Sequence, residues 1–344
     1  MNRTKYFMMI AAAALSGLSV ALGSADGAYL IAGLALVVLG ADWLVEGAAS
    51  LAHRLGVSSF IVGLTVVAFG TSAPELAASI RAALSGESDL AIGNVVGSNI
   101  ANVCLILGLT AVVRPVPCKA KVVRTDVPIM IAVTILGMVF LWTDRTIVRW
   151  EGVVLVLGLF AYTFGIMLVG RGEKKALAAE LEQKLGEFIG TSIDEAPNWR
   201  RHIISAVAGI AALAIGSWLL VDGATGVALS LGVSESVVGL SMVAFGTSVP
   251  ELVTSLAAAI KREADIAVGN ILGSNCFNIL SVLGISSLVA PLVAAPAVLD
   301  RDMWVMLMVA AACLPVFGTM GRITRWEGGT LLAIYVLYLV ILFI

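Results

Sequence analysis

Long apolar runs separated by short polar stretches recur along the whole chain. A run of about 20 apolar residues is long enough to cross the hydrocarbon core of a bilayer as a helix. The pattern therefore predicts an all-α membrane protein with ten transmembrane helices. We place these helices at about 28–50, 59–83, 89–113, 125–143, 151–170, 201–223, 235–260, 265–290, 303–320 and 326–344.

Two stretches do not fit this pattern. Residues 171–200, rich in Glu, Lys and Ala, are the one long polar segment and predict a linker with an amphipathic helix near 174–187. Residues 1–24 carry Arg3 and Lys5 ahead of an apolar stretch. That arrangement is typical of a signal peptide or of an extra, uncleaved span, and both interpretations remain open.

Composition supports a membrane protein and argues against several function classes. Hydrophobic residues make up 60% of the 344 and charged residues 13%, with a mean hydropathy of +1.02, whereas soluble domains carry about 25% charged residues. The sequence has no HExxH motif, no nucleotide-binding loop and no nucleophile with a partnering histidine. We therefore expect neither an enzyme nor an ATP-driven pump, and no cofactor or nucleic-acid partner. The four cysteines lack metal-ligand spacing and predict buried free thiols.

Basic residues are distributed very unequally between alternate loops. Loops on one side hold fifteen Lys and Arg residues, and loops on the other side hold three, Arg145, Arg149 and Arg301. The fifteen are Arg54, Arg114, Lys119, Lys121, Arg124, Arg171, Lys174, Lys175, Lys184, Arg200, Arg201, Lys261, Arg262, Arg322 and Arg325. Because cytoplasmic loops carry the excess of Lys and Arg, we expect an integral protein of a bacterial-type inner membrane. The linker would be cytoplasmic and the C-terminus outside.

The chain contains an internal repeat at a constant offset of 176 residues. Residues 63–83 match residues 239–259 at 14 of 21 positions. Residues 89–115 match residues 265–291 at 12 of 27 positions, and neither alignment needs a gap. The similarity indicates that the chain is built from two copies of one unit.

The two copies are predicted to be inverted. We assign residues 25–170 to the first repeat and residues 201–344 to the second. Each repeat holds five predicted spans, an odd number, so the two enter the membrane in opposite directions. Inverted repeats with polar, interrupted segments in matching places are typical of secondary transporters.

The first repeated motif predicts a broken helix at mid-span. It reads GTSAPE at 70–75 and GTSVPE at 246–251. Proline has no N–H and its ring collides with the carbonyl four residues back, so a helix breaks there. We expect the breaks to be formed by Gly70, Pro74, Gly246 and Pro250. Backbone carbonyls freed around Ala68 to Gly70 and Ala244 to Gly246 need polar partners, because lipid offers none.

Each break places a glutamate in the first turn of the following half-helix, Glu75 in one repeat and Glu251 in the other. A carboxylate at the centre of a bilayer costs roughly 2.5–3.5 kcal/mol on insertion scales, so two at matching positions predict a functional site. Two carboxylates with neutral oxygens around them neutralise one Ca²⁺ or two Na⁺. We predict that Glu75 and Glu251 form a metal-binding site for such hard cations.

The second repeated motif supplies further oxygens. It is GNxxGSNxxN, at 93–102 and again at 269–278. Steps of four place Asn94, Ser98 and Asn102 on one stripe of a helix, and Asn270, Ser274 and Asn278 on another. Asn94 and Asn270 suit either a ligand role or interhelical hydrogen bonding. Asn99 and Asn275 lie off the stripe, which favours helix–helix hydrogen bonds for them.

At these residues the chain resembles the sodium/calcium exchanger branch of the calcium/cation antiporter superfamily. The resemblance rests on GTSxPE followed by GNxxGSNxxN, occurring twice. It implies ten helices in which the first pair of each repeat swings over a rigid core. It also implies that Glu75 and Glu251 are the shared carboxylates. The other implied ligands are the side chains of Thr71, Ser72, Thr247, Ser248, Ser98, Asn102, Ser274 and Asn278 and the carbonyls of Ala68 and Ala244.

The resemblance favours one function over its alternatives. Family members vary between Asp and Asn at the position of Asn278. Asn102 and Asn278 are both neutral here, which is more similar to K⁺-independent exchangers. We expect a monomeric antiporter, embedded in the lipid bilayer, that exchanges Ca²⁺ for Na⁺ by alternating access. A Ca²⁺/H⁺ antiporter using the same glutamates, and a channel-like cation pore, are the alternatives.

Overall fold

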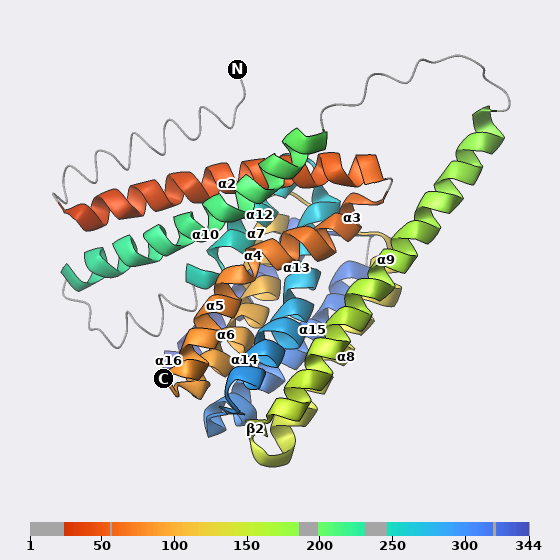
Figure 1. The fold of residues 1–344 in the computed structure, drawn as a ribbon. Helices are drawn as coiled ribbons and strands as arrows, with labels where there is room; N and C mark the ends of the chain where they lie inside the picture. Colours follow the sequence, from red (N-terminus) through yellow and green to blue (C-terminus); the bar gives the residue numbers. More distant parts are fainter. Residues whose placement is uncertain (1–23, 56, 186–198, 231–245, 319–320, 344) are drawn as a thin grey trace.

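The computed structural model in Figure 1 describes residues 24–55, 57–185, 199–230, 246–318 and 321–343. The two interpretations of residues 1–24 therefore concern a segment that lies, except for its last residue, outside the described part of the chain. The described part is built from helices, with four strands of two residues each.

The first repeat begins with one long helix, and most of its later spans are interrupted. The first and fifth spans are α2 (Ala25–Leu55) and α9 (Arg149–Leu185). The spans between them are segmented, with short π-helical stretches marked η: α3 (Ser59–Val62), η1 (Gly63–Val67), α4 (Ala68–Thr71) and α5 (Ala73–Leu84); α6 (Ser88–Ala101), η2 (Asn102–Leu107) and α7 (Gly108–Val113); η3 (Val122–Asp126) and α8 (Val127–Asp144).

The second repeat follows the same plan. Its segments are α10 (Trp199–Ser230); α12 (Val249–Ile260); α13 (Ala264–Phe277), η4 (Asn278–Leu283) and α14 (Gly284–Val289); η5 (Val298–Asp302) and α15 (Met303–Gly318); and α16 (Arg325–Phe343). The π-helical stretches η2 and η4 begin at Asn102 and Asn278, which are equivalent positions.

Eight helices within the described residues are long and apolar enough to cross a membrane, and the bent pair α3–α4 and α5 makes nine. The predicted span at 235–260 is described only from Gly246 onward. The full set of ten spans therefore stays a prediction.

One boundary differs clearly from the prediction. The fifth span does not end near residue 170 but continues as a single helix to Leu185. Residues 173–185 consist of Glu, Lys, Ala, Leu and Gln, all strong helix formers. Nothing in their sequence interrupts the helix that precedes them, so the predicted amphipathic helix is an extension of α9.

The first helices of the two repeats form a layer of their own. Figure 1 shows α2 and α10 lying side by side across the other helices. Their backbones approach closely: a Cβ added to Gly209 would lie 2.6 Å from the backbone nitrogen of Leu44 and 2.7 Å from the carbonyl oxygen of Gly40. Only one helix from each repeat, rather than the predicted pair, stands apart in this way, because the second span is broken and packs into the bundle.

Short antiparallel ladders join equivalent loops of opposite repeats. Strand β1 (Val116–Pro117) pairs with β4 (Arg322–Ile323), and β2 (Thr146–Ile147) pairs with β3 (Leu292–Val293). Each ladder joins loops that the charge pattern had assigned to the same side of the membrane. The pairing supports the predicted grouping of loops and the inverted arrangement of the repeats.

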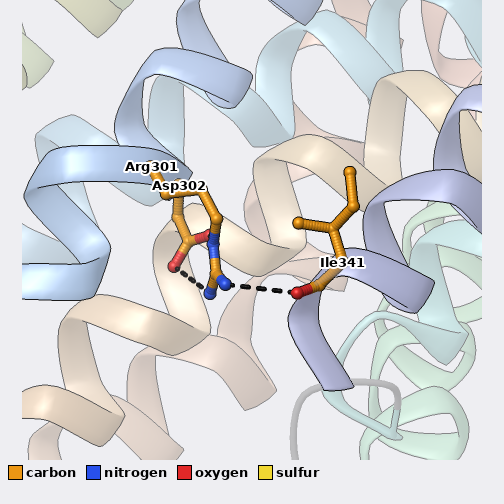
Figure 2. Close-up of polar contacts among 3 residues, drawn as sticks. All are labelled: Arg301, Asp302 and Ile341. Atoms are coloured by element: carbon orange, nitrogen blue, oxygen red, sulfur yellow. Dashed lines mark hydrogen bonds and ion pairs between the residues drawn. The ribbon is translucent and has the colours of Figure 1, made fainter. Parts of the chain in front are cut away.

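The helices of the second repeat are also tied together by a charged residue, Arg301. Its Nε donates to Asp302 Oδ1 at 2.8 Å, and its Nη1 donates to the carbonyl oxygen of Ile341 at 3.4 Å. Figure 2 shows how the guanidinium group connects η5 to α16 through these contacts.

Candidate functional site

Both predicted helix breaks are present. In the first repeat α4 ends at Thr71, Ser72 leaves helical geometry with φ −82° and ψ 4°, and α5 begins at Ala73. The two halves of this span are bent by 41°. In the second repeat Ser248 has nearly the same geometry, with φ −86° and ψ 0°, before α12 begins at Val249. Equivalent residues therefore interrupt equivalent spans.

Each break places its glutamate in the first turn of the next half-helix, as predicted. Glu75 lies in the first turn of α5 and Glu251 in the first turn of α12, and both side chains are 0% exposed. Thr247 is half-buried. The other side chains predicted as ligands are buried as well: Thr71, Ser72, Ser98, Asn102, Ser248, Ser274 and Asn278.

Hydrogen bonds cross between the two breaks. Ser72 Oγ of the first repeat donates to Glu251 Oε1 at 3.0 Å, and Ser248 Oγ of the second donates to Glu75 Oε1 at 3.4 Å. Ser274 Oγ also donates to Glu251 Oε1, at 3.4 Å. The structure thus brings together two glutamates that are 176 residues apart in the chain. It does so through side chains of both repeats.

Four buried oxygens of this cluster have no hydrogen-bond partner among the described residues. They are Glu75 Oε2, Glu251 Oε2, Asn102 Oδ1 and Asn278 Oδ1, one carboxylate and one amide oxygen from each repeat. A buried oxygen without a donor is unfavourable and rare in proteins. Carboxylate and amide oxygens are ligands that hard cations prefer. The arrangement can therefore hold a cation.

Two threonines complete the symmetric pattern. Thr71 Oγ1 donates to Asn270 Oδ1 at 3.1 Å, and Thr247 Oγ1 donates to Asn94 Oδ1 at 3.0 Å. Both asparagines are thus engaged in hydrogen bonds, which fits the interhelical interpretation of these residues.

The predicted role of the Ala68 carbonyl needs correction. We expected the proline to free it, but it accepts the backbone N–H of Ser72 at 3.0 Å and the hydroxyl of Thr71 at 3.3 Å. Pro74 removes the donor only for the residue four positions earlier, which is Gly70. Ala244 lies outside the described residues.

The two break glycines have a packing role that the sequence did not reveal. A Cβ on Gly70 would lie 2.6 Å from the side chain of Ile210, and one on Gly246 would lie 2.0 Å from Val221 Cγ2. Both neighbours belong to α10, so one helix of the separate layer rests directly on both helix breaks.

Two serines were also missed. Asn94 Nδ2 donates to Ser79 Oγ at 3.1 Å, and Asn270 Nδ2 donates to Ser255 Oγ at 3.0 Å. Each serine lies four residues after its glutamate, on the same face of the half-helix. Their identity at the repeat offset was a signal that could have found them.

The asparagines off the ligand stripe connect the two repeats, as predicted. Asn99 Nδ2 donates to the carbonyl oxygen of Asn275 at 3.2 Å. Their side-chain oxygens accept from the amides of Asn278 at 3.0 Å and Asn102 at 3.1 Å. These bonds join α6 and η2 of one repeat to α13 and η4 of the other.

Comparison with known proteins gives consistent results. Residues 27–168 and 201–344 match the family model described as sodium/calcium exchanger protein. The chain is 39% identical to the inner membrane protein YrbG of Escherichia coli over 82% of this chain and 86% of that protein. It is 36% identical to the sodium/calcium exchanger MaX1 of Methanosarcina acetivorans over 91% of this chain and 97% of that one.

A solved structure of similar fold is that of the sodium-calcium exchanger NCX_Mj, in crystals soaked with Na⁺ and Ca²⁺. The two structures align with a TM-score of 0.78 and 30% sequence identity, over 92% of this chain and 97% of the other.

Proposed function

Because the chain belongs to the sodium/calcium exchanger family and is an integral membrane antiporter, we propose that it exchanges Ca²⁺ for Na⁺ by alternating access. The proposed site is shared by both repeats at mid-membrane. The observation that carries the proposal is the set of four buried, unpartnered oxygens, two from each repeat.

We assign the formal charge of the site to Glu75 and Glu251. Within the described residues no three His, Cys, Asp or Glu side chains form a group that could hold a metal ion, so the site charge would be −2. One Ca²⁺ or two Na⁺ neutralise that charge. Because both cations use the same carboxylates, they exclude each other, and each can cross only in exchange for the other.

The remaining ligands in our proposal are neutral oxygens. Asn102 and Asn278 offer the amide oxygens that have no hydrogen-bond partner. The hydroxyl oxygens of Ser72, Ser98, Ser248 and Ser274, which lie at or beside the carboxylates, complete the coordination. Thr71 and Thr247 donate their hydrogens to asparagines and keep oxygen lone pairs for Na⁺.

We also propose the orientation in a bacterial-type inner membrane. The face that carries β1, β4 and the fifteen basic residues would be cytoplasmic, by the preference of Lys and Arg for that side. The C-terminus would then lie outside, and the protein would act as a monomer, since each chain holds both halves of the site.

Transport by the purified protein in liposomes tests the coupling. With Na⁺ inside and none outside, we expect uptake of ⁴⁵Ca²⁺ that stops when the Na⁺ gradient is dissipated. A pH gradient imposed without Na⁺ should not drive uptake. Uptake driven equally well by the pH gradient would overturn Na⁺ coupling and identify a Ca²⁺/H⁺ antiporter.

A channel-like pore gives a different result in the same liposomes. Its flux would need no counter-ion, and it would rise in proportion to Ca²⁺ concentration over a wide range. An antiporter saturates, because each cycle moves the contents of one site.

A further inference from the structure

We propose that Asn99 and Asn275 are positioning residues, which hold the side-chain amides of Asn102 and Asn278 with the oxygen facing the cation. The inference rests on the proposed function, because it concerns the orientation of two ligands of that site. It assigns to two residues outside the ligand set a role in cation affinity.

An asparagine ligand has a problem that a carboxylate does not have. One end of its amide is an oxygen acceptor and the other is an NH₂ donor of similar size. Rotation by half a turn about the last side-chain bond replaces the oxygen with two hydrogens that carry positive partial charge. Such a rotation at Asn102 or Asn278 would turn an attractive ligand into a repulsive one. The site therefore needs something that holds the NH₂ group away from the cation.

The neighbouring asparagines provide this. Asn102 Nδ2 donates to Asn275 Oδ1 at 3.1 Å, and Asn278 Nδ2 donates to Asn99 Oδ1 at 3.0 Å. The opposite ends of the two ligand amides, Asn102 Oδ1 and Asn278 Oδ1, are the ones without a partner. In each case the donor end is used inside the protein, and the acceptor end remains for a cation.

Asn99 and Asn275 are amides too, so their own orientation must be held. Asn275 Nδ2 donates to the sulfur of Met130 at 3.3 Å, and Asn99 Nδ2 donates to the sulfur of Met306 at 3.7 Å. A thioether sulfur only accepts hydrogen bonds, so it selects the NH₂ end of its neighbour. Asn99 Nδ2 also donates to the carbonyl oxygen of Asn275 at 3.2 Å, which acts in the same direction.

The result is two parallel relays that cross between the repeats. One runs from Met130 through Asn275 to Asn102, and the other from Met306 through Asn99 to Asn278. All six side chains are buried. Met130 and Met306 are 176 residues apart, the same offset as the ligands. Each ligand is thus oriented by an asparagine of the opposite repeat.

A double-mutant cycle on the Met130 relay tests this role. In Asn275→Leu, which removes the acceptor with little change of volume, Asn102 loses its orienting bond. We expect the KM for Ca²⁺ in Na⁺-driven exchange to rise roughly tenfold, from the loss of about one hydrogen bond and of ligand alignment. The same Asn275→Leu change is then made in a chain carrying Asn102→Asp. A carboxylate presents oxygen at both ends, so Asp needs no orienting partner.

The proposal predicts that Asn275→Leu raises the KM by less than about twofold in the Asn102→Asp background, a strong non-additivity. A merely structural role for Asn275 predicts the same rise in both backgrounds, and that result would overturn the proposal. Asn99→Leu, tested with and without Asn278→Asp, is the matched cycle for the other relay. Unfolding midpoints of all variants in detergent separate loss of folding from loss of affinity.

The proposed function and this inference fail in different ways. If the unmodified protein shows no Na⁺-driven Ca²⁺ uptake, the proposed function is wrong. If it shows that uptake and the two cycles are additive, the function stands and the positioning role is refuted.

Discussion

At the centre of the molecule, the hydrogen bonds described for one repeat have counterparts in the other. The bond from Thr71 to Asn270 measures 3.1 Å and its counterpart from Thr247 to Asn94 measures 3.0 Å. The relays through Asn275 and Asn99 are equivalent in the same way. Towards the periphery this correspondence is lost. Asp42 of α2 and Lys261 at the end of α12 form an ion pair at 2.6 Å, whereas the equivalent positions hold Trp218 and Ser85.

A second difference lies beside α8 and α15. Thr125 and Asp126, with Gly158 and Gly165 of α9, line a cavity of about 400 Å³. In the second repeat the positions of Thr125, Gly158 and Gly165 hold Arg301, Ile334 and Ile341. There the Arg301 guanidinium pairs with Asp302 and binds the backbone of Ile341 (Figure 2). Larger side chains replace the small ones that line the cavity.

The contrast separates two requirements of the proposed mechanism. The site must present the same oxygens whichever face it opens to, so both repeats contribute equivalent groups. If the repeats were identical throughout, the two access states would be related by symmetry and equal in free energy. Residues that differ between the repeats, such as Lys261 and Arg301, are therefore where the balance between the two states can be set.

The largest expected effect comes from removing either central charge. Glu75→Gln and Glu251→Gln should each lower Na⁺-driven ⁴⁵Ca²⁺ uptake at least about a hundredfold, because a site of charge −1 no longer neutralises Ca²⁺. Glu151→Gln is a matched control. That acid accepts the backbone N–H of Val148 at 2.9 Å, away from the site, and uptake should stay within about twofold. A large effect of only one of the two glutamates would break the equivalence of the repeats.

The crossed serines should have the next largest effect. Ser72→Ala and Ser248→Ala each remove a hydrogen bond to a carboxylate, an interaction of about 1.5–3 kcal/mol. We expect the KM for Ca²⁺ to rise about tenfold in each variant. A change confined to one variant would show that the two carboxylates are not held in equivalent ways.

Packing between the repeats predicts a loss of stability for Gly273→Ala. The added Cβ would lie 2.6 Å from the Leu64 carbonyl oxygen and 2.7 Å from Ala68 Cβ. Overpacking of this kind costs about 1–3 kcal/mol, so the unfolding midpoint in detergent should fall by several degrees. Gly329→Ala, whose added Cβ meets no described atom within 4 Å, should leave the midpoint unchanged. An equal fall in both variants would contradict close packing at Gly273.

The smallest effect is expected at the asymmetric ion pair. Lys261→Ala removes the contact between α2 and the end of α12, and partly exposed pairs contribute under about 1 kcal/mol. Hydrogen–deuterium exchange in the second half of α2 should therefore speed up by only two- to threefold, roughly. Lys119→Ala is the control, because its partner Asp265 belongs to α13 and not to α2. Equal changes in α2 for both variants would refute a specific role for Lys261.

Much of this architecture was predictable because its signals are local or repeated. Apolar runs located the spans, and Pro74 and Pro250 located the breaks within about two residues. The constant offset, with an odd number of spans in each repeat, indicated that the two glutamates would meet. None of these inferences needs knowledge of how distant side chains pack.

Other features have no local signal. The continuation of α9 to Leu185 crosses a boundary that polarity alone suggested. The freed carbonyl at Ala68 was wrong because a proline affects the residue four positions back, and its neighbours keep their bonds. Met130 and Met306 lie in apolar runs, where a thioether is ordinary packing material. Only the fold shows that their sulfurs face asparagine amides.

The central claim is that one glutamate from each repeat holds the same Ca²⁺. Equilibrium binding of ⁴⁵Ca²⁺ to the purified protein tests it most directly, with Na⁺ titrated as competitor. We predict one Ca²⁺ per chain, displaced by Na⁺, and no measurable binding in either Glu75→Gln or Glu251→Gln at the concentrations that saturate the unmodified protein. Binding of Ca²⁺ that survives in both variants, or that Na⁺ does not displace, would contradict the account.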